Sequence, residues 1–567
     1  MSFFEKYGAL LLIWLAVSVW VAVVILTNRK IHPWALFMLF LVELWERFSY
    51  YGMRALLVLY LSAETMKAGF GFEKKAAVGI YAAYGALVYL TPLAGGFLAD
   101  KLLGFRKAII WGAILMGCGQ FTLSASAFLQ DPAEATAPAV VAPAEGEKPA
   151  DAKPADGEKP TDGAKPPPAV KVETKSLPRT LLLYTGLALL VVGNGFFKPN
   201  ISSLIGRYYP AGDPRRDGAF TIFYMGINIG AFLTPLTCGM IGETEGWQWG
   251  FLCAGIGMAV GLCIFLYTVK AGYLEKHADP PPSTTNAPKV PTVAVYALSL
   301  LTLPLFGLLI KFNDLMDYLL IVVGTAAIGY MLFLSFRYPT VERQRIWVIV
   351  VLLVFTAIFW TFFELAGSAL NLFTESNVNR TVLEIGTWKW TPNASEFQAA
   401  NAFFIMAFAP VFSVLWIMLA KKNLEPSAPV KFAIGLLLLG AGFVVLNLGK
   451  GFATDFMMPA MWLLLLYLLH TLGELALSPV GLSLVTKLAP ARIVGFMMGF
   501  WFLSSAFAHQ AGKWIARESV AAENATKEQT LNQALEVFNV VGLTALGSGV
   551  LLLLLSPIIK KWMHGVK

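Results

Sequence analysis

Long apolar stretches alternate with short polar segments along almost the whole chain. A helix needs about 20 apolar residues, at 1.5 Å each, to cross the ~30 Å hydrocarbon core of a bilayer. The pattern therefore predicts an all-α, polytopic membrane protein with about fifteen spans. The first covers about 8–27, and the others cover roughly 33–62, 76–99, 107–129, 179–206, 218–242, 249–271, 291–311, 316–336, 346–371, 396–420, 430–449, 457–488, 493–516 and 535–559.

Composition supports this interpretation. The 567 residues are 57% hydrophobic and only 14% charged, whereas soluble domains are roughly 45–50% apolar and about 25% charged. Four cysteines lie in apolar stretches without metal-ligand spacing, so we expect packed free thiols, no metal site and no cofactor. They are Cys118, Cys238, Cys253 and Cys263.

The net charge of +8 comes from basic groups that lie between spans, and this arrangement favours topology signals over nucleic-acid binding. The first apolar segment has Lys6 before it, a heavier basic flank after it and no cleavage site, so we expect a retained span with its C-terminal end inside. Alternation of the spans then places the C-terminus and most basic clusters in the cytoplasm, with Lys74 and Lys75 as the exception. The membrane is expected to be the cell (inner) membrane. The cytoplasmic clusters are Lys101/Arg106/Lys107, Arg207/Arg215/Arg216, Arg343/Arg345, Lys421/Lys422, Lys487/Arg492 and Lys560/Lys561.

Two outside segments differ from the spans. Residues 131–178 repeat Pro, Ala, Lys and Asp without apolar periodicity, which predicts a disordered extracytoplasmic insertion. Residues 372–395 are predicted to form a second, shorter outside loop, because they include Glu375, Asn377 and Arg380.

One span carries four charges. Glu43, Glu46, Arg47 and Arg54 follow a helical repeat and share one face. Each would cost roughly 2.5–3.5 kcal/mol at the bilayer centre. We therefore expect this face to line a wet cavity inside the protein; the alternative is a structural ion-pair network between helices.

Other spans also carry charge, in both halves of the chain. Lys198 lies in G-N-G-F-F-K-P-N, Glu364 in F-W-T-F-F-E-L-A-G-S, and Glu474 in T-L-G-E-L-A-L-S-P. Ionisable groups in both halves are typical of a central transport site. His470 is interpreted as a packing histidine.

The segment E-L-W-E-R-F-S-Y-Y-G resembles the E-x-x-E-R-F-x-Y-Y-G signature of the proton-dependent oligopeptide transporter family, a branch of the major facilitator superfamily. The resemblance covers nearly the whole chain apart from the first span and the 131–178 segment. It continues through G-F-L-A-D-K-L-L-G-F-R-K, F-F-K-P-N, F-Y-M-G-I-N-I-G-A-F, F-Q-A-A-N-A-F-F-I-M-A-F-A-P and G-E-L-A-L-S-P-V-G-L-S-L-V-T-K-L-A-P.

This resemblance implies a domain organisation. An extra N-terminal span (1–30) would precede an N-terminal six-helix bundle (31–271). A linker with two inserted helices (272–342) and a C-terminal six-helix bundle (343–567) would follow. The first span is outside the family pattern, and we predict no role for it.

The resemblance also implies residue roles. Proton coupling would involve Glu43, Glu46, Arg47, Lys198 and Glu364. Arg47 and Lys198 would receive the peptide carboxylate, and Glu474, Asn228 and Asn401 the amino group. Side-chain pockets would be lined by Tyr50, Tyr51, Tyr89 and Trp501, and Arg54 and Glu364 would pair as an extracytoplasmic gate.

The chain departs from the family pattern at two places. Leu365 replaces a frequent Gln, and A-F-A-H-Q (506–510) stands where a Gly-Asn pair is more usual.

The function implied is a proton-coupled symporter that imports di- and tripeptides by alternating access, with protons, peptides and lipid as partners. We expect protonation to weaken carboxylate pairing with Lys198 or Arg54. One alternative is the same fold carrying nitrate or another small metabolite, although Glu474 argues against a simple anion. A transport-dead sensor is another. No catalytic triad, metal cluster or Walker loop indicates an enzyme, and no oligomeric state is predicted.

Overall fold

The computed structural model describes residues 3–129, 176–209, 213, 215–274, 290–386, 388–490 and 493–566. The predicted disordered insertion lies outside these ranges except for its last three residues, which lead into a helix.

The first half of the chain is a series of long helices. They are α1 (Phe3–Asn28), α2 (Trp34–Ser62), α3 (Lys74–Leu98), α4 (Phe105–Phe128), α5 (Leu177–Tyr208), α6 (Arg216–Thr234), α7 (Met240–Thr244) and α8 (Trp247–Lys270). Short helical turns extend α3 through η2 (Ala99–Leu103) and join α6 to α7 through η4 (Pro235–Gly239). A connecting pair of spans follows: the first consists of α9 (Thr292–Leu301) and α10 (Leu303–Lys311), and the second is α11 (Leu315–Ser335).

The second half is built in the same way. Its helices are α12 (Thr340–Phe363), α13 (Ala369–Asn377), α14 (Ala399–Lys421), α15 (Ala428–Leu448), α16 (Ala460–Leu488), α17 (Val494–Ser519) and α18 (Lys527–Trp562). A short 3₁₀ segment, η7 (Glu364–Gly367), joins α12 to α13, and η8 (Ser395–Gln398) precedes α14.

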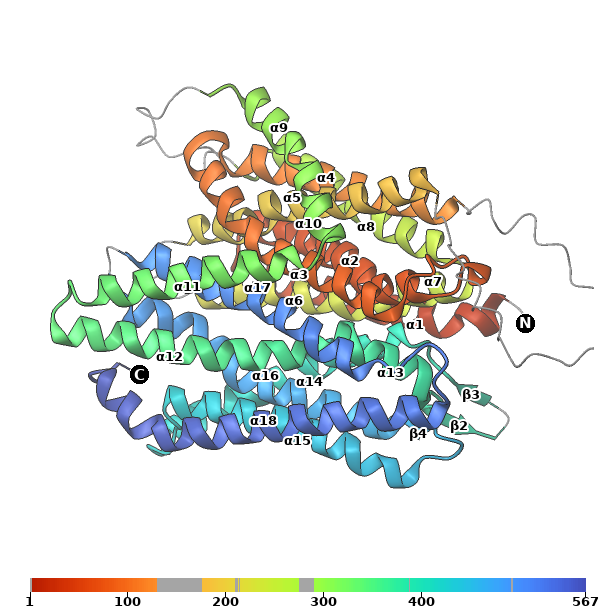
Figure 1. The fold of residues 1–567 in the computed structure, drawn as a ribbon. Coiled ribbons are helices and arrows are strands. Elements are labelled where there is room, and N and C mark those ends of the chain that lie inside the picture. Colours follow the sequence, from red (N-terminus) through yellow and green to blue (C-terminus); the bar gives the residue numbers. More distant parts are fainter. Residues whose placement is uncertain are drawn as a thin grey trace, which may run out of the picture.

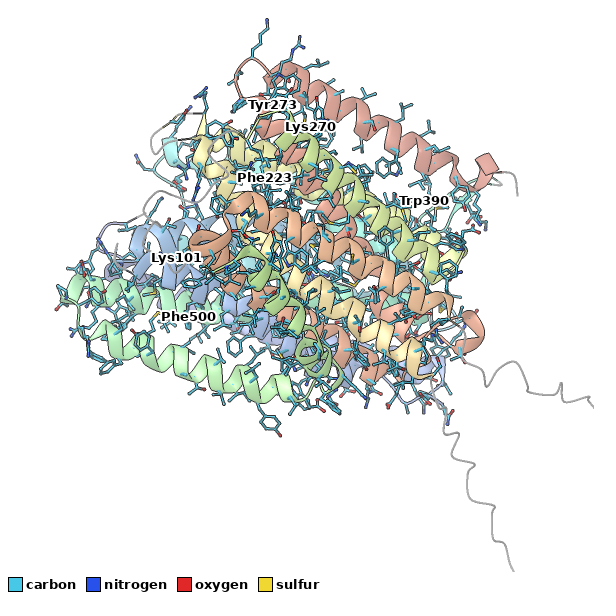
Figure 2. All side chains as sticks on the ribbon, turned by 90° about the horizontal axis from the view of Figure 1, so that it is seen from above. Lys101, Phe223, Lys270, Tyr273, Trp390 and Phe500 are labelled. Atoms are coloured by element: carbon cyan, nitrogen blue, oxygen red, sulfur yellow. The ribbon has the colours of Figure 1, made fainter. Side chains whose placement is uncertain are left out.

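The predicted multi-span fold is confirmed. In the described part of the chain, thirteen helical segments are long and apolar enough to cross a membrane. The two other predicted spans correspond to α2, which carries the charged stripe, and α17, which carries several polar residues. The two termini lie at opposite ends of the helices (Figure 1), as an odd number of spans requires. Figure 2 shows Lys101 and Lys270 at one end and Trp390 at the other.

The helices form two groups, one from each half of the chain (Figure 1). The groups meet where α3 packs on α17 and where α6 packs on α14. The inserted pair touches both, because α10 packs on α5 and α11 packs on α12 and α17. These contacts surround the charged face of α2 with helices from both halves.

The extra helix α1 packs on the first group. Trp14 donates a hydrogen bond from Nε1 to Thr237 Oγ1 at 3.0 Å, and its ring stacks on Trp45 at 5.9 Å between centroids. Lys6 pairs with Glu245 near one end. The face that carries Leu12 and Leu15 is exposed, and a bilayer would cover it.

The second outside loop is more structured than predicted. Its start belongs to α13, and β1 (Val378–Asn379) pairs in parallel with β4 (Met458–Pro459). A hairpin of β2 (Leu383–Ile385) and β3 (Trp388–Trp390) follows. Tertiary contacts stabilise α13, in which Asn371 Nδ2, for example, donates to the Ala55 carbonyl at 3.0 Å.

Glycines allow α4 and α5 to approach closely. A Cβ added at Gly112 would lie 2.7 Å from the Gly193 carbonyl oxygen, and one at Gly193 would lie 2.8 Å from the Gly112 carbonyl oxygen. Small residues at such crossings are the usual basis of tight packing between membrane helices. This crossing fixes the position of α5, which carries Lys198.

We expect Gly112→Ala to destabilise the protein by about 1–3 kcal/mol through overpacking. The matched control is Gly117→Ala on the same helix, where an added Cβ meets only Met258 at 3.9 Å. Its stability should be unchanged or higher, because Ala favours a helix over Gly. Thermal unfolding in detergent measures both, and equal melting temperatures would contradict this view of the crossing.

Candidate functional site

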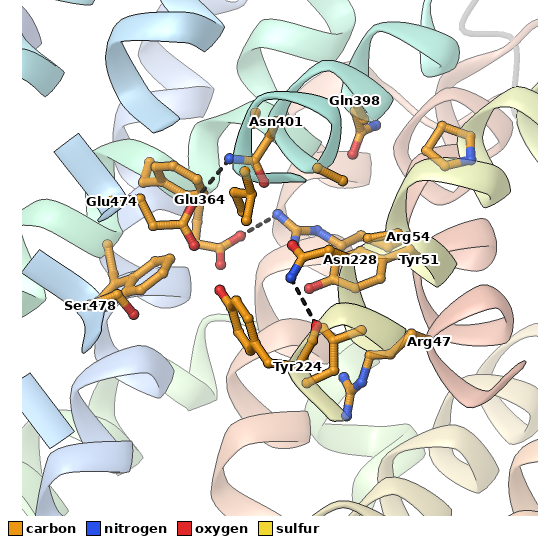
Figure 3. A pocket seen from close by; sticks show the side chains of 18 of the residues that line it. Arg47, Tyr51, Arg54, Tyr224, Asn228, Glu364, Gln398, Asn401, Glu474 and Ser478 are labelled. Carbon is orange, nitrogen blue, oxygen red and sulfur yellow. Dashed lines mark hydrogen bonds and ion pairs between the residues drawn. The ribbon is translucent and has the colours of Figure 1, made fainter. Parts of the chain in front are cut away.

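A central cavity of about 340 Å³ lies between the two groups of helices. Its volume is in the range of small-molecule sites, roughly 300–1,000 Å³. Both halves contribute polar and aromatic side chains to its lining (Figure 3). The predicted site residues that line it are Glu43, Arg47, Tyr51, Arg54, Tyr89, Lys198, Asn228, Glu364, Asn401 and Glu474.

Arg47 is held by two carboxylates of its own helix. Its Nε lies 2.7 Å from Glu43 Oε1 and 2.8 Å from Glu46 Oε2. The two carboxylates, one and four positions before Arg47, reach the same guanidinium, and all three side chains are buried. Charges with so little access to water must be paired, so the loss of either carboxylate's charge would weaken the pairing of Arg47 within α2.

Lys198 is placed differently from the prediction. Its Nζ lies 4.2 Å from the centre of the Tyr89 ring, and none of the carboxylates in the described ranges pairs with it. The expected pairing of a signature carboxylate with Lys198 is therefore wrong for this conformation, since Arg47 holds both Glu43 and Glu46. The lysine ammonium faces the cavity and can bind an anion.

The acidic end of the cavity belongs to the second half. Asn401 Nδ2 donates to Glu474 Oε2 at 2.9 Å and to Thr471 Oγ1 at 3.0 Å. Asn228 Nδ2 donates to the Tyr224 carbonyl at 3.0 Å. Figure 3 shows Arg47 and Glu474 on opposite sides of the cavity. The cavity thus has the basic side chains of Arg47 and Lys198 at one end and the Glu474 carboxylate at the other.

Arg54 joins the two halves. It forms an ion pair with Glu364 of η7, and its Nε donates to Tyr81 Oη at 2.9 Å. Both charged side chains are almost fully buried. The helix break at η7 turns Glu364 toward α2, so this pair depends on how the halves sit relative to each other.

Three predicted residues lie outside the cavity lining: Glu46, Tyr50 and Trp501. Glu46 is fully buried behind Arg47. The Tyr50 ring packs edge-on against Tyr51 at 5.2 Å, and Trp501 packs against Phe432. These side chains support the lining from behind.

His470, interpreted above as a packing histidine, and Tyr467 also line the cavity. Sequence reasoning missed four further polar residues of the lining, which are Ser202, Tyr224, Gln398 and Ser478. Each lies three or four positions from a predicted site residue on a helical segment. Extending the helical repeat one turn from Lys198, Asn228, Asn401 and Glu474 would have found them.

Comparison with known proteins identifies a family and several similar proteins. A family model described as the POT family matches residues 106–532. The chain is 35% identical over 503 residues to a peptide transporter of Yersinia enterocolitica, covering 85% of this chain and 86% of the relative. It is 31% identical over 550 residues to a di-/tripeptide transporter of Lactococcus lactis, covering 94% and 97%.

A solved structure of the peptide transporter POT in complex with alafosfalin is similar throughout. The TM-score is 0.73 at 32% identity, and the match covers 94% of this chain and 96% of that one. Together with the family match over most of the chain, this similarity leads to one conclusion. The chain belongs to the POT family of membrane transporters, and its helices form the major facilitator fold.

Proposed function

We propose that this protein is a proton-coupled symporter that imports di- and tripeptides by alternating access. The observation that carries the proposal is the two-ended cavity, with Arg47 and Lys198 at one end and Glu474 at the other. A peptide is a zwitterion, and charge-assisted bonds to its two termini give affinity without reading its side chains. The names of the Yersinia and Lactococcus relatives support the same substrate class.

Coupling follows from the two buried ion-pair groups. A peptide carboxylate that binds Arg47 competes with Glu43 and Glu46, so a carboxylate released from Arg47 gains affinity for a proton. A proton on Glu364 removes the charge that holds Arg54, which loosens the contact between the halves. Each inward proton supplies about 2.3 kcal/mol per 100 mV of membrane potential, enough to bias the exchange between two states.

The proposal includes an organisation in the membrane. The extra span (1–30), two six-helix bundles (31–271 and 343–567) and the linker with its inserted helices (272–342) would lie in the cell (inner) membrane with the C-terminus in the cytoplasm. Basic residues such as Lys101 and Lys270 at one end of the helices support this orientation.

Counterflow in proteoliposomes tests the cargo. Vesicles loaded with unlabelled dialanine should take up labelled dialanine, and di- and tripeptides should compete. Failure of every peptide, with competition by nitrate or another small metabolite, would favour the alternative cargo. A correctly folded protein that moves none of these solutes would favour a sensor.

We expect Glu474→Gln to weaken dialanine binding roughly 10- to 100-fold, because a charge-assisted hydrogen bond is worth about 1.5–3 kcal/mol. N-acetyl-dialanine has no amino charge, so the same substitution should leave its weaker affinity unchanged. Glu425→Gln is the matched control, since Glu425 pairs with Lys431 outside the cavity. Competition against labelled dialanine measures each affinity, and equal losses for both ligands would contradict the assignment.

A further inference from the structure

A second, small cavity lies behind Glu364. Its lining comes from α3, η7 and α17 and includes Tyr81, Glu364, Ser368, His509 and Lys513. Glu364 also lines the central cavity, so its carboxylate stands between the two spaces. The volume is about 10 Å³, close to what a single water molecule requires.

His509 faces Glu364 across this space. Its Nε2 lies 4.0 Å from Glu364 Oε1 and has no hydrogen-bond partner among the described residues. The side chain is only 4% exposed. An unpartnered ring nitrogen so deeply buried is costly, and a structural role alone does not explain it.

The ring is held in this orientation from two sides. It stacks on Tyr89 at 5.3 Å between centroids, with an angle of 29° between planes. A Cβ added at Gly85 would lie 2.6 Å from its Nδ1, so α3 approaches here only because position 85 is glycine. The imidazole is therefore fixed, with Nε2 directed toward the carboxylate.

The other charged groups nearby already have partners or sit farther from the ring. Arg54 of α2 pairs with the other oxygen of Glu364, Oε2, and with Tyr81 of α3. Lys198 of α5 lies over the ring of Tyr89, the residue on which His509 stacks.

One turn along α17, Lys513 Nζ is held 2.6 Å from Asp317 Oδ2 and 3.0 Å from Asp314 Oδ1. Hydrogen bonding to Lys513 keeps the pKa of Asp314 below its ordinary value, so Asp314 stays ionised. Gln510 also donates to Asp317 at 2.7 Å. Glu364 Oε1 is therefore the carboxylate oxygen that the imidazole faces.

We propose that His509 exchanges a proton with Glu364 during transport, an inference that rests on the proposed symport function. The imidazolium N–H bond at Nε2 breaks and an O–H bond forms at Glu364 Oε1, either after a small approach or through one bridging water. Imidazole and carboxyl group are then both neutral, and Arg54 loses its anionic partner. The O–H bond of Glu364 later breaks as its proton passes to water on the inner side, and a hydronium ion from the outer side reprotonates the imidazole, so charge and protons balance over one cycle.

This role is particular to the sequence of α17. His509 stands in the A-F-A-H-Q segment, where the resemblance described above implies a Gly-Asn pair. Histidine changes charge between about pH 5 and 8, whereas an asparagine amide does not. The substitution adds a titratable group next to the carboxylate that holds the two halves together.

The test compares His509→Asn with the wild type in two proteoliposome assays. Counterflow of dialanine requires peptide exchange but no net proton movement, and it should stay within about two-fold of wild type. The proton-driven uptake rate should fall about 10-fold or more, as is typical for loss of an acid–base group, and its dependence on pH between about 5.5 and 7.5 should flatten. His32→Asn is the control, because His32 is also buried against a tyrosine, at 2.9 Å from Tyr209 Oη, far from the cavity.

An unchanged pH profile with full proton-driven uptake would overturn the proposal. So would equal loss in both assays for His509→Asn and for the more conservative His509→Gln, because that pattern indicates packing alone. Failure of the wild type to exchange dialanine is a separate outcome, which contradicts the proposed function itself.

Discussion

Replacing Glu46 with glutamine is expected to abolish uphill accumulation of dialanine. Glu46 is fully buried, and its carboxylate pairs with Arg47 at 2.8 Å. Glutamine keeps the shape of the side chain but can neither release a proton nor pair as an anion. Peptide binding at Arg47 would then no longer be linked to proton uptake in α2.

The measurement is dialanine uptake driven by a pH gradient, with counterflow as a readout of intact exchange. We expect the variant to reach only equal concentrations inside and outside. Glu384→Gln is the control, because Glu384 pairs with Lys389 in the exposed β2–β3 hairpin and should not affect accumulation. If Glu46→Gln accumulated dialanine to the wild-type level, Glu46 would have no role in coupling proton movement to peptide transport.

Arg54→Met should both stop transport and destabilise the protein. Removing one partner of a buried ion pair costs about 3–5 kcal/mol, because the other charge is left without compensation. Thermal unfolding in detergent measures the loss of stability, and dialanine uptake measures the loss of transport.

The double variant Arg54→Met/Glu364→Gln makes the prediction specific. It has no stranded charge, so it should recover most of the lost stability while uptake remains absent. Arg215→Met serves as the control, since Arg215 is half exposed and pairs with Asp213 at 2.9 Å near the surface, where ion pairs contribute little. A double variant as unstable as the single one would contradict the Arg54–Glu364 account.

The spans and the charged stripe could be predicted because the bilayer imposes strict rules. A helix must be about 20 residues long, and charges inside it must share a protected face. The repeat from Glu43 to Arg54 satisfied both conditions, so its inward orientation followed from spacing alone. The helix and strands within the second outside loop could not be predicted, because α13 is stabilised by contacts such as Asn371 with the Ala55 carbonyl, which no local pattern reveals.

The pairing inside the site could not be predicted from spacing. Arg47 pairs with both Glu43 and Glu46 of its own helix, and spacing along α2 does not show that Lys198, on α5, lies over the ring of Tyr89 instead of pairing with one of these carboxylates. The small cavity at His509 likewise depends on the close approach of α3, η7 and α17. Contacts among three segments depend on tertiary packing, and the periodicity of a single helix does not predict them.

The central claim is that a proton gradient drives peptides through this cavity. The most direct measurement is labelled dialanine uptake into proteoliposomes with an inward proton gradient and a membrane potential of about −100 mV. The account predicts accumulation above equilibrium, up to about 50-fold for one proton driven by the potential alone, which a protonophore collapses. Uptake that stops at equal concentrations and ignores the protonophore would contradict it.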